Sequence, residues 1–367
     1  MANTSPKPPT WENLDWEVLD RLRATFLSDA RTAGPYWHTV TDLETYDFTY
    51  GERIGWKWDA VLRVLGARNW APPGGTLLDW GCGSGIAGRR VIAAFGPVRF
   101  SRLVLHDHSP LAVEYAEHRA RRDFPSLVVE RASIRFLRGD EPIGLLVVSH
   151  VVNELDDAGR ADLQALLARA EAVLWVEPGT HEASRGLIAF RESARAAGFS
   201  LVAPCPHPGP CGLLVPGKER HWCHFFADSP PGVHADSGWV RFAQRAGIDL
   251  RALPYSYLVL ARRPLAAHPA PAPAPRAARS EADDEHEPRT GHPARVLGMP
   301  RLYKGYAKLF ACSAEGVREL TLQKRDAPAV FKTLKRGDAS AGDDWIVSGD
   351  QIRPTPGTPE SPAGPSD

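Results

Sequence analysis

The 367-residue sequence has no long hydrophobic run, no excess charge and few cysteines. It contains no stretch of about 18 apolar residues, which argues against a membrane-spanning helix. Its first residues lack the basic and apolar regions of a secretory signal. Lys plus Arg and Asp plus Glu both number 44, so no overall charge draws the protein to a membrane or to DNA. We therefore expect a cytoplasmic protein whose five cysteines are reduced.

Three of those cysteines lie close together in the sequence. Cys205, Cys211 and Cys223 fall in a segment rich in proline, glycine and histidine, and 88 residues separate Cys223 from Cys312. Three histidines lie in the same segment: His207, His221 and His224. The chain has no C-x-x-C pair, which disfavours a standard zinc finger, although thiolates with a histidine would still suit zinc and four thiolates would suit an iron-sulfur cluster. The spacing predicts a metal site and leaves zinc and iron open.

From residue 76, short apolar runs alternate with stretches of helical periodicity. The predicted strands are 76–80, 102–106, 145–149, 172–176, 199–203 and 255–260, and the predicted helices are 86–95, 110–123, 158–171 and 184–197. This alternation is typical of a parallel sheet covered by helices. The sequence therefore predicts an α/β fold with a Rossmann-like, doubly wound sheet.

The remaining regions differ from this pattern in composition. The predicted division is a helical N-terminal region at 1–70, the α/β domain at 71–263 with a cysteine-rich insertion at 204–226, a disordered linker at 264–294, a small basic β module at 295–337 and a disordered tail at 338–367. The β module is expected to be a small antiparallel sheet with strands at 304–309, 317–324 and 329–334. Between Arg295 and Arg336 it holds ten Lys or Arg against three acids, beside Tyr303, Tyr306 and Phe310. Such a surface either binds nucleic acid, with bases stacked on aromatic rings, or is an ordinary solvated face.

The first predicted strand ends in Asp79 and runs into a glycine-rich turn that opens a helix. The turn contains Gly81, Gly83 and Gly85, and Gly88 follows within the predicted helix. A glycine turn at the carboxyl end of a strand is where open α/β sheets bind nucleotide-like cofactors. The spacing also matches dinucleotide-binding motifs, but Asp79 stands where a carboxylate would receive the ammonium group of S-adenosylmethionine. Asp107, after the second strand, is expected to accept hydrogen bonds from ribose hydroxyls; its alternative role is a helix cap.

Asp79, Gly81, Gly83, Gly85 and Asp107 together resemble class I S-adenosylmethionine-dependent methyltransferases, over roughly residues 70 to 262. The segment after the fourth strand, 149–155, contains no Asn-Pro-Pro-Tyr or Asp-Pro-Pro-Tyr, which disfavours methylation of an amino group on a base. We assign no catalytic residue from the sequence, and whether methyl transfer occurs stays open.

The segments 152–155, 176–180, 203–211 and 221–225 resemble a small-ribosomal-subunit methyltransferase-like family of bacteria and mitochondria, and this resemblance covers most of 40–336. It implies a four-iron four-sulfur cluster on Cys205, Cys211, Cys223 and Cys312, and association with the small ribosomal subunit and its RNA. Trp80 and Cys82 depart from the glycine loop expected of the family. The alternative interpretation is a small-molecule methyltransferase with a structural zinc.

Overall fold

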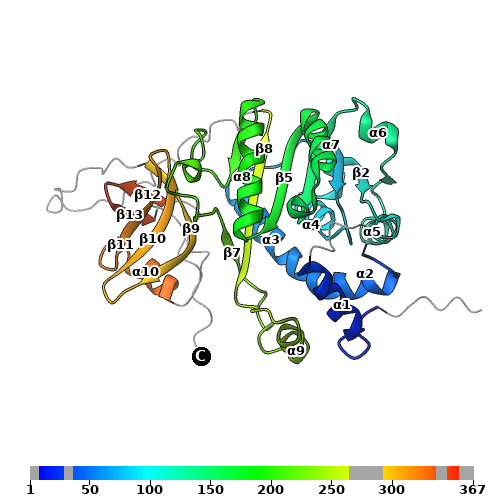
Figure 1. Cartoon of the computed structure of the whole chain (residues 1–367), viewed down its shortest axis with the longest axis horizontal. Coiled ribbons are helices and arrows are strands. Elements are labelled where there is room, and N and C mark those ends of the chain that lie inside the picture. The colour runs from blue at the N-terminus through cyan, green and yellow to red at the C-terminus, as the bar shows by residue number, and fades with distance from the viewer. Residues whose placement is uncertain (1–7, 29–35, 264–291, 336–344, 355–367) are drawn as a thin grey trace, which may run out of the picture.

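The structure is a computed structural model that describes residues 8–28, 36–263, 292–335 and 345–354. It contains an α/β domain and a small β-barrel beside it (Figure 1). The predicted linker lies, except for its last residues, outside the described part of the chain. Among the described helices, none combines the length and the apolar character needed to cross a membrane.

A sheet of eight described strands forms the centre of the α/β domain. The strands are β1 (Gly75–Trp80), β2 (Phe100–His106), β3 (Val129–Arg131), β4 (Ile143–Ser149), β5 (Ala170–Pro178), β6 (Ser200–Ala203), β7 (Phe225–Ala227) and β8 (Leu253–Ala261). They lie in the order β3-β2-β1-β4-β5-β8-β6, with β7 paired to β8. β1 to β5 are parallel, whereas β8 is antiparallel to β5, β6 and β7.

Helices cover both faces of this sheet, as the sequence predicts. They are α4 (Ile86–Phe95), α5 (Pro110–Asp123), α6 (Ile134–Arg138), α7 (Asp157–Ala168), α8 (His181–Ala196) and α9 (Ser237–Ala246), with short 3₁₀ turns η3 (Pro97–Arg99), η4 (Val152–Glu154) and η5 (Gly212–Leu214). Leu77 and Leu78, both fully buried on β1, belong to separate core clusters on opposite faces. Local signals fix the start of α5, because Ser109 accepts a hydrogen bond from Ala112 N–H and Pro110 occupies the first turn.

The N-terminal region is helical, with α1 (Trp16–Phe26), α2 (Val40–Tyr46), the π-helical turn η2 (Asp47–Gly51) and α3 (Glu52–Ala67). Buried Asp47 anchors it to the α/β domain. Its carboxylate accepts hydrogen bonds from Arg89 Nη2 at 2.8 and 2.9 Å and from Arg119 Nη1 at 2.5 Å. Because Arg89 lies on α4 and Arg119 on α5, this ion-pair network fixes the N-terminal helices against the α/β domain.

The C-terminal module is a closed five-stranded barrel in the order β10-β11-β13-β12-β9. Its strands are β9 (His292–Leu302), β10 (Tyr306–Ser313), β11 (Gly316–Gln323), β12 (Trp345–Ser348) and β13 (Gln351–Pro354), and α10 (Pro328–Lys335) lies between β11 and β12 in the chain. Only the β11–β13 pair is parallel among these described strands. This strand order, with a helix between the third and fourth strands, is that of an OB-fold.

Two sequence expectations for this region are wrong, and a third needs a smaller change. Residues 329–334 form helix α10 rather than a strand, because Phe331 and Leu334, three residues apart, both pack into the barrel core. Strands β12 and β13 lie within 338–367, for which the sequence predicts disorder, and their buried side chains gain their contacts from distant strands. Strand β9 begins at His292, inside the predicted linker.

Candidate functional site

The glycine loop between β1 and α4 has a left-handed backbone that side chains with a Cβ rarely adopt. The angle φ is +71° at Gly81, +50° at Gly83 and +76° at Gly85. A Cβ on Gly81 would in addition lie 2.6 Å from Cγ1 of Val151. Conformation and space therefore both favour glycine, and the loop brings bare backbone to the edge of the sheet.

A cavity of about 660 Å³ opens beside this loop. It lies where the strand order reverses, between β1 and β4, the place where open α/β sheets bind ligands. Its size is within the range of about 300–1,000 Å³ typical of small-molecule sites. Gly81, Gly83 and Asp107 line one side. The N-terminal region contributes aromatic lining residues: Phe26, Tyr36, Trp37, Tyr46 and Tyr50.

Asp79 is fully buried at the end of β1 and does not itself line the cavity. Its Oδ2 accepts the backbone N–H of Gly88 at 3.0 Å, whereas Oδ1 is buried without a hydrogen-bond partner among the described residues. Burial raises the pKa of this carboxyl group to about 7. An unsatisfied buried oxygen beside the loop fits a cationic ligand group, but the contact with the ammonium of S-adenosylmethionine stays a prediction.

Asp107 lines the cavity and organises its rim. Its Oδ2 accepts the N–H of Gly83 at 2.9 Å, and its Oδ1 accepts the N–H of Ser109 at 2.9 Å. The side chain that caps α5 is that of Ser109, so Asp107 is not the cap. Asp107 therefore joins the glycine loop to the turn after β2, and its contact with a ribose stays a prediction.

The sequence does not predict a cluster of ionisable groups that also lines this cavity. Lys57 on α3 is 9% exposed, and its Nζ lies 3.4 Å from Nε2 of His150, just beyond β4. Glu177 on β5 is 1% exposed. All three line the cavity. The one local signal was a lysine between two tryptophans, Trp56 and Trp58, that are themselves buried in α3.

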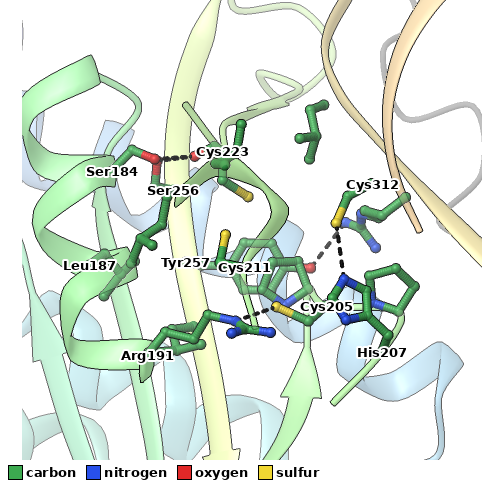
Figure 2. A pocket seen from close by; sticks show the side chains of 17 residues that line it. Ser184, Leu187, Arg191, Cys205, His207, Cys211, Cys223, Ser256, Tyr257 and Cys312 are labelled. Atoms are coloured by element: carbon green, nitrogen blue, oxygen red, sulfur yellow. Dashed lines mark hydrogen bonds between the residues drawn. The ribbon is translucent and has the colours of Figure 1, made fainter. Parts of the chain in front are cut away.

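The four predicted metal ligands line a second cavity (Figure 2). Cys205, Cys211 and Cys223 come from the insertion, and Cys312 comes from β10 of the barrel. The cavity has a volume of about 40 Å³, which is room for a few water molecules. The described residues that line it include His207 and two arginines but no Asp or Glu.

Arg191, buried on α8, supplies positive charge to this cysteine cavity. Its Nε donates to Sγ of Cys205 at 3.1 Å. Nε2 of His207 lies 3.4 Å from Sγ of Cys312. Burial raises the pKa of the Cys312 thiol to about 12 and that of Cys223 well above its usual value. These two thiols are therefore protonated at neutral pH, and binding a metal would release their protons.

The barrel packs against the α/β domain around the cysteine cavity. Gly298 N–H on β9 donates to the carbonyl oxygen of His224 at 2.9 Å. Arg295, also on β9, donates to the Tyr257 hydroxyl at 3.0 Å and lies 4.7 Å from the Phe225 ring centroid. Three further barrel residues join the α/β core: Leu297, Cys312 and Val317. The cysteine cavity is thus part of the interface between the two units.

Within the described residues, no three His, Cys, Asp or Glu side chains are arranged as a metal site. The four-cysteine cluster and the zinc alternative therefore both stay predictions. Two of the candidate histidines pack on aromatic rings, with His221 at 4.5 Å from Phe310 and His224 at 4.6 Å from Trp222 between centroids. Cys82 lies apart from the other cysteines, in the lining of the first cavity.

The sheet order, the antiparallel β8 beside β5 and the glycine loop at the reversal point define a class I methyltransferase fold, which confirms the predicted fold class. A model of the family described as mitochondrial small ribosomal subunit Rsm22 matches residues 53–346. Because the match spans most of the sequence, the chain belongs to this family.

Solved structures of methyltransferases share this fold at low identity. Magnesium protoporphyrin IX methyltransferase from Synechocystis, with bound S-adenosylmethionine, is 11% identical with a TM-score of 0.38, over 71% of this chain and 100% of that one. TrmK from M. capricolum, with bound S-adenosylhomocysteine, is 6% identical with a TM-score of 0.32, over 56% and 67%. At these values the likenesses carry no argument about activity. No curated protein sequence matches the chain.

Proposed function

We propose that the protein is an S-adenosylmethionine-binding, methyltransferase-like factor of the small ribosomal subunit. In this proposal it binds the subunit's RNA through its barrel and carries a four-iron four-sulfur cluster on the four cysteines that line one cavity. The observation that carries the proposal is the glycine loop with its cavity at the reversal point of the sheet, in a chain of this family.

The first cavity fits the cofactor in shape and in chemistry. The bare backbone of Gly81 and Gly83 allows close approach, and Asp107 is available to ribose hydroxyls. Asp79 Oδ1 and Ser84 Oγ are buried and lack hydrogen-bond partners among the described residues. S-Adenosylmethionine would supply a methyl group activated by its sulfonium sulfur. Calorimetry with S-adenosylhomocysteine tests the assignment, and a protein that does not bind it would refute this part.

The second cavity fits a cluster in its donors and its charge. Four cysteines line it without a carboxylate among the described lining residues, and Arg191 and Arg295 lie with them. Two arginines would offset the negative charge of thiolate ligands, and the hydrogen bond from Arg191 to Cys205 is of the kind that adjusts a cluster's reduction potential.

Metal analysis after anaerobic purification distinguishes the two metals. We expect iron and acid-labile sulfide in equal amounts, about four of each per chain. Finding one zinc per chain without sulfide would support the zinc alternative instead of the cluster. Cys82→Ser is the matched control, because Cys82 lies in the other cavity and should leave the metal content unchanged.

The basic surface covers a smaller part of the barrel than the number of Lys and Arg residues suggests. Arg295 is buried at the interface, and other cations are in ion pairs: Arg301 and Lys308 with Glu319, and Arg318 with Glu315. Lys304 and Lys324 are exposed and adjoin the turn between β9 and β10, where Lys324 N–H donates to Gly305. The rings of Tyr303 and Tyr306 stack there at 4.6 Å.

We propose that RNA contacts this turn, since OB-folds bind oligonucleotides at the loop between their first two strands and on the adjoining strand face. The lysines would contact phosphates, and the tyrosines would stack bases. In cosedimentation with small ribosomal subunits, Lys304→Glu with Lys324→Glu should weaken association and flatten its salt dependence. Lys332→Glu, an exposed site on α10, is the control. A wild-type protein that does not associate would favour a small-molecule methyltransferase instead.

A further inference from the structure

Three ionisable side chains from three elements meet in the lining of the first cavity. Lys57 lies on α3, His150 follows β4, and Glu177 is near the end of β5. His150 has a φ of +57°, a left-handed conformation that is uncommon outside glycine. Such backbone strain is concentrated at functional sites. None of these three side chains has a role in the cofactor contacts proposed above.

A chain of hydrogen-bonding groups ends at Lys57. Trp58 Nε1 donates to Ser149 Oγ at 3.0 Å, and Ser149 Oγ lies 3.3 Å from Nδ1 of His150. An indole N–H only donates, so the hydroxyl proton of Ser149 is available to Nδ1. In the tautomer in which Ser149 donates to Nδ1, the ring proton of the neutral imidazole is on Nε2, which faces Lys57 Nζ at 3.4 Å. An uncharged amine accepts that proton in a hydrogen bond, whereas an ammonium group has no lone pair to do so.

The charges around Lys57 also favour the amine. Burial, and next the charge of Arg53, lower the Lys57 pKa to about 7, against the opposing effect of Glu177. Burial and then the charges of Lys57 and Arg53 hold the His150 pKa well below its usual value, so the imidazole is neutral. Lys57 is therefore able to change its protonation state near neutral pH, while His150 keeps its own.

Hydrogen bonds fix the side chain of Glu177 in the lining of the same cavity. Its Oε1 accepts the N–H groups of Val151 at 3.1 Å and Val152 at 3.2 Å, and that of Trp175 Nε1 at 2.5 Å. Burial raises its pKa to about 7. When Lys57 gains a proton, the charge of the Glu177 carboxylate stabilises the ammonium group.

Another part of the cavity lining is aromatic. Trp37 contacts Tyr36 with ring centroids 4.6 Å apart and Tyr46 at 4.9 Å. Burial raises the pKa of Tyr46 and of Tyr36, so their hydroxyls stay neutral. A wall of packed rings suits a flat ligand that stacks or packs edge-on.

We propose that Lys57 is the proton acceptor for methyl transfer in this cavity, and that the methyl acceptor is a flat ring carrying an N–H or O–H group. His150 is a positioning residue that holds Lys57 as the free amine. This inference rests on the proposed function, because it requires S-adenosylmethionine in the cavity, and it assigns to that site an activity that the sequence left open.

The step balances with the groups present. The acceptor nitrogen or oxygen bonds to the methyl carbon while the carbon–sulfur bond of S-adenosylmethionine breaks and leaves its electron pair on sulfur. Lys57 Nζ takes the proton that the acceptor loses and becomes an ammonium group, whose charge Glu177 stabilises. Lys57 then returns this proton to water at the mouth of the cavity. A base of this kind typically contributes a factor of about 10² to 10⁴ in rate.

The test uses the full chain and small ribosomal subunits isolated from cells that lack it. Transfer of tritium from methyl-labelled S-adenosylmethionine is measured from about pH 6 to 9 for the wild type, Lys57→Met, His150→Gln and Arg63→Met. We expect wild-type transfer to rise with pH around a midpoint near 7, and Lys57→Met to lose about 10²-fold or more. His150→Gln should shift the midpoint upward. Arg63→Met, exposed on the same helix, should match the wild type.

Two parallel measurements separate the possible failures. If calorimetry finds no binding of S-adenosylhomocysteine, the proposed function fails at its cofactor. If binding is normal but neither the RNA nor the proteins of the subunit acquire label, or if Lys57→Met transfers at the wild-type rate, the inference is overturned. NMR of ¹³C-labelled lysines gives a readout without turnover: a Lys57 signal that titrates together with the surface lysines would also overturn it.

Discussion

Replacing Lys57 by methionine should stabilise the fold, although it removes a charged group from the centre of the molecule. Lys57 is 9% exposed and its pKa falls from 10.5 to about 7, chiefly because of burial. Methionine keeps a long unbranched side chain and needs no solvation of a charge. The buried lysine therefore costs stability that the substitution recovers.

The magnitude follows from the two protonation states. The unfolded chain binds a proton at Lys57 up to about pH 10.5, whereas the folded chain releases it near pH 7. Between these values the unfolded state binds more protons, so wild-type stability rises with pH. The cost is fully present below pH 7, where at 1.36 kcal/mol per pKa unit it reaches about 5 kcal/mol as an upper value, and it is lost above pH 10.5.

Thermal unfolding at several pH values measures this effect. We expect Lys57→Met to melt above the wild type at about pH 6.5, by roughly 2–4 °C for each kcal/mol recovered, and the gain to shrink toward pH 9. Arg63→Met should change little, because its side chain is exposed on the same helix. A variant that melts below the wild type at pH 6.5, or a gain independent of pH, would refute the reasoning.

Three further predictions concern the two cavities. Asp79→Asn should weaken binding of S-adenosylhomocysteine about tenfold or more in calorimetry. Wild-type affinity should rise from pH 6 to 8 as the Asp79 carboxyl, whose pKa is about 7, ionises. Equal affinities of variant and wild type would argue against the ammonium contact. Gly81→Ala should lower the midpoint of urea unfolding, by about 1–3 kcal/mol in stability, because φ is +71° and the new Cβ would meet Val151; an unchanged midpoint would show that the loop can relax. Cys312→Ser should lose iron and should speed hydrogen exchange at Gly298 N–H, which donates to the His224 carbonyl oxygen across the interface. Loss of metal with unchanged exchange would show that barrel docking does not depend on the cluster.

The parts of the fold that the sequence predicts are those with local causes. The predicted helices 86–95 and 110–123 have the same ends as α4 and α5, where Gly85, Gly96 and Ser109 supply end signals within a few residues. The barrel has fewer such signals. β9 contains Gly298 with φ +67° and an irregular register with β10, so its apolar pattern is broken.

The candidate site likewise contains residues that the sequence predicts and residues that it does not. The glycine loop and the cysteine segment are visible as patterns, and the structure brings Cys312 to the other three thiols around one cavity. Lys57 and Glu177 give no pattern, because their burial depends on how α3 packs against the sheet, where Trp58 Nε1 donates to Ser149 at the end of β4, far along the chain. A single lysine in an amphipathic helix is ordinarily a solvated residue, and only the tertiary structure distinguishes this one.

Strands β5 and β8 connect the two cavities. Ser256 on β8 donates to the carbonyl oxygen of Cys223 at 2.7 Å, and its partner in the ladder with β5 is Glu177. Glu177 and Lys57 both line the first cavity, while Cys223 lines the second. Metal binding to thiols from both units would couple cluster assembly to barrel docking in one equilibrium. The hydrogen bond from Ser256 to Cys223 connects this metal site to β5, the strand that carries Glu177. Loss of metal should therefore affect the surroundings of Lys57 as well as the docking of the barrel.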